Sequence, residues 1–320
     1  MIEKRFKSLD EQIKILEYKG LVIRNEKYAK DILLRENYFF LNGYRHLFLV
    51  SEEDRRYKEG TTFEELYSMF LFDRKLRNIL FKNLLVIENN LKSISSYQLS
   101  KKYGYKEKDY LKEKNFTSDP ERRRQVKDLI SKMKRQIRIN GREHSATLHY
   151  ANNYGYIPLW ILVKVLSFGI VCEMYSILKP EDQKAIADVY HIDKNTLITY
   201  LPILANYRNL CAHEDILFDN RSQKSIDDTI FHRVLDIEKK DGEYIYGKND
   251  LYALIIIMKD MLRGDEFTNM IIEIEHVVDE LSHNLHTISV DKVLRKMGFP
   301  SNWSDIMNIE RSYITDEENE

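Results

Sequence analysis

The sequence predicts an all-α protein. Its 320 residues include only 11 Gly and 5 Pro, and so few chain-breaking residues favour long helices over a turn-rich β architecture. The clearest helix begins after Thr62, which is spaced to form a capping box with Glu65. Apolar residues then recur with helical spacing from Phe63 to Ile94. This pattern predicts an amphipathic helix of about ten turns.

The opposite face of this long helix is predicted to be polar. Its residues are Asp73, Arg74, Lys75, Arg77, Lys82, Glu88 and Lys92. Glu88 and Lys92 are one helical turn apart, and we interpret them as an ion pair on the helix surface.

Shorter elements are expected on both sides of the long helix. Two helices precede it, and after it a basic helix, a buried helix that begins at Pro158, a short helix at Pro180 and a helix capped by Asp193 or Asn195 follow. Pro202 lies inside the last of these, where we expect a kink. Asp241-Gly242 indicates a turn, with a short hairpin near Tyr244. The expected ranges are 9–19, 25–35, 122–142, 158–178, 180–191, 195–213, 251–262 and 267–285.

We divide the chain into three regions. Residues 1–50 form a helical lead-in, residues 51–221 a helical core, and residues 222–320 a C-terminal helical region. The last region ends in an acidic tail that includes Asp316, Glu317, Glu318 and Glu320.

Composition favours a cytoplasmic protein. The two cysteines, Cys172 and Cys211, form neither a disulfide framework nor a zinc-binding set. The charged N-terminus lacks an apolar signal core, and the most apolar run, Ile157 to Cys172, is too short to span a bilayer. No phosphate-binding loop or metal-binding motif is present, so neither a cofactor nor a metal is expected.

The net charge of −1 gives no indication of nucleic acid, but the distribution of charge does. Residues 122–142 contain nine basic residues and one acid, Asp128, together with an apolar stripe. This basic amphipathic helix is suited to contact an RNA backbone, because phosphate neutralisation dominates such binding. The alternative is a solvated face balanced by acids elsewhere. The residues concerned are Arg122, Arg123, Arg124, Lys127, Lys132, Lys134, Arg135, Arg138 and Arg142.

An aromatic group follows the basic helix. Tyr150, Tyr154, Tyr156 and Trp160 are of the type that stacks on bases, but we expect them to pack in the core.

Arg208 and His213 supply the chemistry of metal-independent RNA cleavage. In that reaction the 2′-hydroxyl attacks the neighbouring phosphorus, histidine transfers a proton, and arginine meets the charge that builds on phosphoryl oxygens. Asn209 lies one turn before His213 and is placed to hold the imidazole. A two-fold dimer would bring two such sets together.

Spacing alone leaves a structural interpretation open. A similar Arg and His spacing recurs at Arg138/His144 and Arg142/His149. A helix histidine held by Asn209 beside an Arg208 ion pair would give the same pattern. Cys211, inside the segment, is expected to be a small buried residue.

The segment Asn206–His213 resembles the core of the HEPN superfamily, in particular the Abi-like (AbiD/AbiF-type) abortive-infection proteins of bacteria. Further matching segments occur in order along about residues 10–300. They are Gln12–Ile13, Gly20–Ile23, Asn37–Phe39, Gly43–Tyr44, Phe72–Arg77, Ile87–Glu88, Tyr154–Trp160, Leu166–Gly169 and Met297–Trp303.

This resemblance implies a HEPN-type helical bundle with additional N-terminal and C-terminal helical elements. It also implies endoribonuclease activity with Arg208, Asn209 and His213 as catalytic residues, in phage defence or a toxin–antitoxin pair. The implied partners are substrate RNA, a small noncoding RNA and a second copy of the chain. The family pattern after the motif is replaced here by Glu214-Asp215, whose charges would repel phosphate. A non-catalytic RNA-binding module therefore remains the alternative.

Overall fold

The computed structural model describes residues 5–51 and 53–310, and it is all-α apart from one hairpin. The acidic tail and the side chain of Arg142 lie outside the described residues. The first half of the fold contains helices α1 (Leu9–Tyr18), α2 (Glu26–Glu36), α3 (Tyr38–Asn42), α4 (Phe63–Tyr103), α5 (Glu107–Tyr110), α6 (Arg123–Glu143), α7 (Ser145–Tyr154), α8 (Leu159–Val165) and α9 (Phe168–Ser176). Short 3-10 helices η1 (Arg45–Leu47), η2 (Glu113–Asn115) and η3 (Pro120–Arg122) connect them.

The second half begins with α10 (Pro180–Ala187), the 3-10 helix η4 (Asp188–Tyr190) and α11 (Lys194–Ala212). The remaining elements are α12 (Ile230–Val234), strands β1 (Lys239–Lys240) and β2 (Glu243–Tyr244), α13 (Leu251–Met261), α14 (Gly264–Asn284), α15 (Val290–Met297) and η5 (Trp303–Asn308). The strands pair antiparallel around Asp241 and Gly242, both with positive φ, which confirms the predicted turn.

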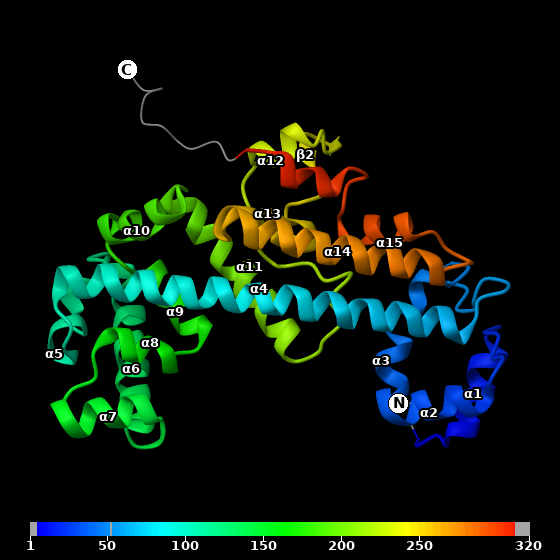
Figure 1. Cartoon of the computed structure of the whole chain (residues 1–320), viewed down its shortest axis with the longest axis horizontal. Coiled ribbons are helices and arrows are strands. Elements are labelled where there is room, and N and C mark those ends of the chain that lie inside the picture. Colours follow the sequence, from blue (N-terminus) through cyan, green and yellow to red (C-terminus); the bar gives the residue numbers. More distant parts are fainter. Residues whose placement is uncertain (1–4, 52, 311–320) are drawn as a thin grey trace.

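Helix α4 runs through the whole molecule (Figure 1). Helices α1 to α3 lie near its first turns, α5 to α9 gather near its last turns, and α14 runs along it. The helix starts as predicted: the amide of Glu65 donates to Oγ1 of Thr62, and the amide of Thr62 donates to Oε2 of Glu65. The other oxygen of Glu65 accepts from the amides of His286 and Thr287. One carboxylate therefore caps α4 and fixes the chain that follows α14.

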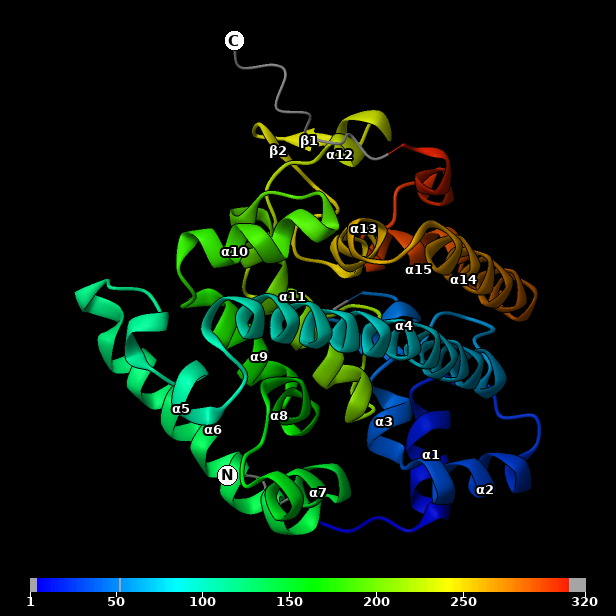
Figure 2. The ribbon, with the colours of Figure 1, turned by 60° about the vertical axis from the view of Figure 1, so that its left-hand side comes forward.

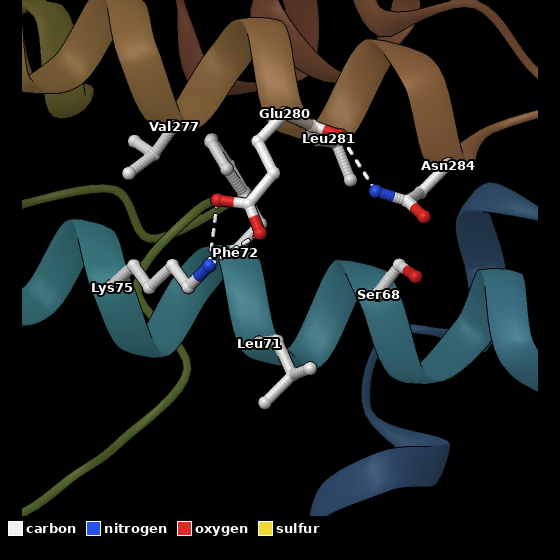
Figure 3. Close-up of a pocket in the computed structure, with 8 residues that line it drawn as sticks. All are labelled: Ser68, Leu71, Phe72, Lys75, Val277, Glu280, Leu281 and Asn284. Carbon is white, nitrogen blue, oxygen red and sulfur yellow. Dashed lines mark hydrogen bonds and ion pairs between the residues drawn. The ribbon is translucent and has the colours of Figure 1, made fainter.

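The seam between α4 and α14 contains a small cavity of about 140 Å³ (Figure 3). Lys75 and Glu280 bridge it, with Nζ to carboxylate distances of 2.5 and 2.6 Å. The pair joins two helices that also pack through Phe72 and Leu281. We regard this cavity as a packing feature of the seam.

Two of the sequence predictions are corrected by the fold, which also contains further helices. The helix expected over 158–178 is two helices, because the Ser167 side chain accepts from the amide of Ile170 and starts α9 anew. Helix α13 is buried on all sides from Leu251 to Lys259, so it is not amphipathic. Helix α15, like α7 and α12, is an additional element that the sequence does not predict.

Candidate active site at the end of helix α11

Helix α11 places the Arg208–His213 segment at its C-terminal end. Asp193 caps the start of the helix by accepting from the amide of Asn195, and His213 is the residue that ends it. Glu214 follows with φ +56° and reverses the chain. In both views the last turns of α11 lie between α9 and α3 (Figures 1 and 2).

Arg208 is held by a buried carboxylate from α4. Its Nε donates to Oε2 of Glu88 over 3.0 Å, and Lys92 donates to the other oxygen of Glu88 over 2.7 Å. Glu88 and Lys92 are only 5% and 8% exposed. The predicted ion pair forms, but its predicted place on the surface is wrong, because α11 covers this face of α4 and supplies a second cation to the carboxylate.

The bond through Nε leaves the two terminal nitrogens of Arg208 without a hydrogen-bond acceptor in the described part of the chain. The side chain is 28% exposed, so this end of the guanidinium is accessible. Phe81 lies beneath it, with the ring centre 5.8 Å from Cζ. Glu88 therefore holds the Nε edge of the Arg208 guanidinium. The edge with the two terminal nitrogens is open, and its geometry matches that of a phosphate group.

Asn209 and His213 are exposed. The backbone amide of His213 donates to the carbonyl of Asn209 over 3.0 Å. Within the described residues, no hydrogen bond joins the Asn209 side-chain amide to the imidazole. The contact expected between these two side chains is therefore replaced by a backbone contact, and both side chains face solvent.

The chain after His213 is anchored by a second carboxylate, Asp73. It accepts from the hydroxyl of Tyr44 and from the amides of Leu217 and Phe218, over 2.8, 3.2 and 2.9 Å. Arg77 completes this cluster by pairing with Asp73. The predicted polar face of α4 therefore faces inward at these positions.

Burial raises the pKa of Asp73 to about 6, although Arg77 and the hydrogen bonds act in the opposite direction. Arg77 Nη1 also donates to the carbonyl of Asp215 over 3.2 Å. The Asp73–Arg77 pair therefore fixes the backbone that follows His213, the candidate catalytic histidine. Sequence spacing of one turn was the only signal that could have pointed to it.

Glu214 lines a cavity of about 160 Å³ together with Arg35, Arg74 and Arg77. The pKa of Arg74 is raised, first by its hydrogen bond to Glu36 and further by the charge of Glu214. The charge of Glu214 therefore acts on Arg74, although each of these arginines already pairs with another carboxylate.

Cys211 is 7% exposed, and burial raises the pKa of its thiol to about 12. The thiol is therefore protonated at neutral pH. This confirms the expectation of a small buried residue.

Helix α6 is the predicted basic amphipathic helix. Its apolar stripe, which includes Leu129 and Met133, is buried. Arg122 donates to the carbonyl of Ser176, and Lys132 pairs with Glu173. Arg124 lies 3.9 Å from Asp128. Five exposed side chains have no carboxylate partner among the described residues: Arg123, Lys127, Lys134, Arg135 and Arg138.

The aromatic group after α6 divides between core and surface: Tyr150 is half-buried and packs against the core as expected, whereas the exposure of Tyr154 and Trp160 corrects the expectation of core packing. Tyr154 and Trp160 are 56% and 43% exposed. The ring of Tyr156 lies 5.6 Å from that of Tyr105, and Lys106 lies 5.0 Å above the Tyr156 ring. Tyr154 and Trp160 are exposed because α7 and α8 pack through Thr147, Leu159 and neighbouring residues instead.

Over residues 5–51 and 53–310, no group of three or more His, Cys, Asp or Glu side chains is arranged to hold a metal ion. None of the helices in this part of the chain is both long and apolar enough to cross a membrane.

Comparison with known families places this site in context. A family model described as Abi-like protein matches residues 31–219, more than half of the chain. The chain belongs to the Abi-like protein family. The match in this Abi-like chain spans α4, α6 and α11, and hence Asp73, Glu88 and the Arg208–His213 segment. No curated protein and no solved structure matches the chain.

Proposed function

We propose that this Abi-like protein is a metal-independent endoribonuclease of the HEPN type that acts in abortive infection against phage. The observation that carries the proposal is the way in which the Arg208 side chain is held. Buried Glu88 orients its guanidinium through Nε, while the two terminal nitrogens remain exposed. Such an arginine is preorganised to meet charge on a phosphoryl group.

In this mechanism the 2′-hydroxyl of RNA attacks the adjacent phosphorus and the bond to the 5′-oxygen breaks. His213 removes the proton from the 2′-hydroxyl or delivers one to the 5′-oxygen. Arg208 stabilises the charge on the non-bridging oxygens. Asn209 lies one turn before His213, and in this proposal its exposed side chain orients the imidazole when RNA is bound.

A two-fold dimer gives each reaction both an acid and a base. Arg208 and His213 are five positions apart, which on a helix is about 140° of rotation and about 7.5 Å of rise. One protomer therefore presents its arginine and histidine from different sides of α11. A partner across a two-fold axis supplies the second histidine.

RNA is the proposed partner outside the active site as well. The unpaired cations of α6 form a stripe, since Arg123, Lys127, Lys134 and Arg138 are spaced to share one face of a helix. Such a stripe suits a phosphate backbone, including that of a small noncoding RNA that restrains the enzyme. Arg142 belongs to the same proposal from the sequence alone.

The test of cleavage compares the wild-type protein with His213→Ala and Arg208→Ala on cellular RNA in the presence of EDTA. We expect each variant to lose about 100-fold or more of the cleavage rate. His276→Ala and Arg24→Ala are matched controls, because both residues are exposed and distant in sequence from the site. Equal cleavage by wild type and His213→Ala would overturn the mechanism.

The same samples address the alternative of a non-catalytic RNA-binding module. If neither wild type nor variant cleaves RNA but both retain RNA that high salt removes, the module is the correct description. Sequencing the RNA that copurifies with the wild-type protein would identify the partner. A purified protein free of RNA, with no cleavage, would overturn both proposals.

A further inference from the structure

A pocket far from the α11 motif in the sequence joins the N-terminal region to α15. It has a volume of about 350 Å³, within the range of small-molecule sites in proteins. Leu47 and Leu49 give it an apolar wall, and the polar side chains at its edge are His46, Ser51, Lys292, Arg295 and Lys296. We call this the basic pocket.

The three cations of α15 follow from helical spacing. Lys292, Arg295 and Lys296 occupy positions i, i+3 and i+4, so they project from one face. The other face of this helix, with Val293 and Met297, is buried. The amphipathic pattern of α15 therefore directs its positive charge into the basic pocket.

The positive charge in the basic pocket is not balanced within the described residues. Lys292, Arg295 and Lys296 form no ion pair there, although lysines elsewhere on the surface commonly do. Lys292 donates to the carbonyl of Leu47 over 2.7 Å, which carries no net charge. The pKa of Lys292 is lowered, first by burial and then by Lys58 and Lys296. Within the described residues no carboxylate lies within ion-pair distance of the three α15 cations, although, against the effect of burial, the hydrogen bond from His46 and then the charge of Lys296 lower the pKa of Asp219.

Two of the described carboxylates near the rim of the pocket already have partners. Asp219 lies 3.2 Å from Nε2 of His46, and Glu53 accepts from the hydroxyl of Ser51 over 3.0 Å. Neither is within ion-pair distance of the α15 cations. Clustered cations of this kind are costly in an empty protein unless an anion offsets the repulsion.

We propose that the basic pocket binds a nucleotide-sized phosphomonoester, with the phosphate on the α15 cations and the nucleoside against Leu47 and Leu49. A terminal phosphate carries more charge than a backbone diester and so matches several cations at once. The source of this group is either a free nucleotide or the phosphorylated end of an RNA. The site is separate from Arg208 and His213 and does not depend on cleavage.

The basic pocket also contacts the segment that follows the motif. His46 stacks on Phe218, with ring centres 5.4 Å apart, and pairs with Asp219. Phe218 is in turn anchored by its amide to Asp73. A ligand in the pocket therefore lies one side chain away from the chain that positions the end of α11.

The experiment measures binding of 5′-AMP to the full-length protein by titration calorimetry, with adenosine and inorganic phosphate as comparison ligands. We expect AMP to bind and the double variant Arg295→Gln/Lys296→Gln to bind it about tenfold or more weakly. Lys101→Gln/Lys108→Gln is the matched control, since it removes the same charge from exposed residues at the other end of α4. Its affinity should equal that of wild type.

Short RNAs with a 5′-phosphate or a 5′-hydroxyl distinguish the two sources, and the His213→Ala background prevents cleavage. Preference for the phosphorylated RNA without binding of AMP assigns an RNA end, and binding of AMP assigns a nucleotide. Three results would overturn the proposal: neither AMP nor phosphorylated RNA shows a phosphate-dependent affinity, inorganic phosphate binds as well as AMP, or both double variants weaken binding equally. Loss of cleavage in any variant has no bearing on these outcomes.

Discussion

Two ion pairs on α4, Asp73–Arg77 and Glu88–Lys92, have the same spacing of one helical turn but differ in what surrounds them. Asp73 is fully enclosed, and its partners are Arg77, a tyrosine hydroxyl and two backbone amides. Glu88 is also buried, but its second partner is Arg208, whose outer edge reaches solvent. The same spacing of an acid and a base can thus serve two purposes. The first pair fixes the backbone after α11, and the second orients the side chain of Arg208.

The enclosed pair is expected to give the largest effect on stability. Asp73→Ala leaves Arg77 buried without a counter-charge and removes the acceptor of two amides, so the free energy of unfolding should fall by about 3–5 kcal/mol. Chemical denaturation followed by circular dichroism measures it. Asp279→Ala, an exposed acid on α14, is the control. A cost below about 1 kcal/mol, typical of surface pairs, would show that the cluster is not a structural anchor.

The open pair is expected to affect cleavage as well as stability. Glu88→Gln deprives Lys92 and Arg208 of their carboxylate, and the free energy of unfolding should fall by about 2–3 kcal/mol. The cleavage rate of the folded variant should fall by about tenfold or more, because Arg208 is no longer oriented. Kinetics at a temperature where the variant is folded separate the two effects.

The control for Glu88→Gln is Glu280→Gln, which breaks the exposed pair with Lys75. It should leave cleavage unchanged. If Glu88→Gln lost stability and kept full activity, Glu88 would be a structural residue like Asp73, and the contrast between the two pairs would disappear.

The enclosed pair also predicts a dependence of stability on pH. The pKa of Asp73 in the folded protein, about 6, lies above its ordinary value of 3.8. The stabilising contribution of the protonated group is therefore fully present below the ordinary value and is lost as the pH rises through about 6. The free energy of unfolding of wild type relative to Asp73→Asn should fall over this window by an amount on the order of 3 kcal/mol. A difference that does not change with pH would contradict the raised pKa.

These contrasts explain what sequence could and could not predict. Local signals such as the Thr62 capping box and the Asp241-Gly242 turn are complete within a few residues, so the elements they define are confirmed. The inward position of Asp73 and Glu88 depends on segments more than 100 residues away. Periodicity assigns charged residues to a solvent face and has no access to such partners.

The features of the candidate site likewise divide into those that a local segment predicts and those that depend on tertiary packing. Arg208 and His213 were identified from their own segment, and the resemblance to Abi-like proteins is confirmed by the family match. From the sequence, Glu88 is predicted only to pair with Lys92. Its contact with Arg208 depends on the packing of α11 on α4, which the sequence does not reveal. The exposure of Tyr154 and Trp160 was missed, since aromatic composition favours the core and the tertiary packing of α7 and α8 decides otherwise.

The smallest expected effect is on the pair between His46 and Asp219. This pair lies on the outer side of the segment after α11, and Asp73 anchors the inner side of the same segment. His46 pairs with Asp219 at 3.2 Å, and both side chains are about one third exposed. A pair this open to solvent contributes little, so His46→Gln should lower the free energy of unfolding by less than about 1 kcal/mol. Thermal or chemical denaturation beside Asp73→Ala gives the comparison directly. A loss as large as that of Asp73→Ala would mean that the segment is held as firmly from its outer face, through the stacking of His46 on Phe218, as it is by the buried carboxylate.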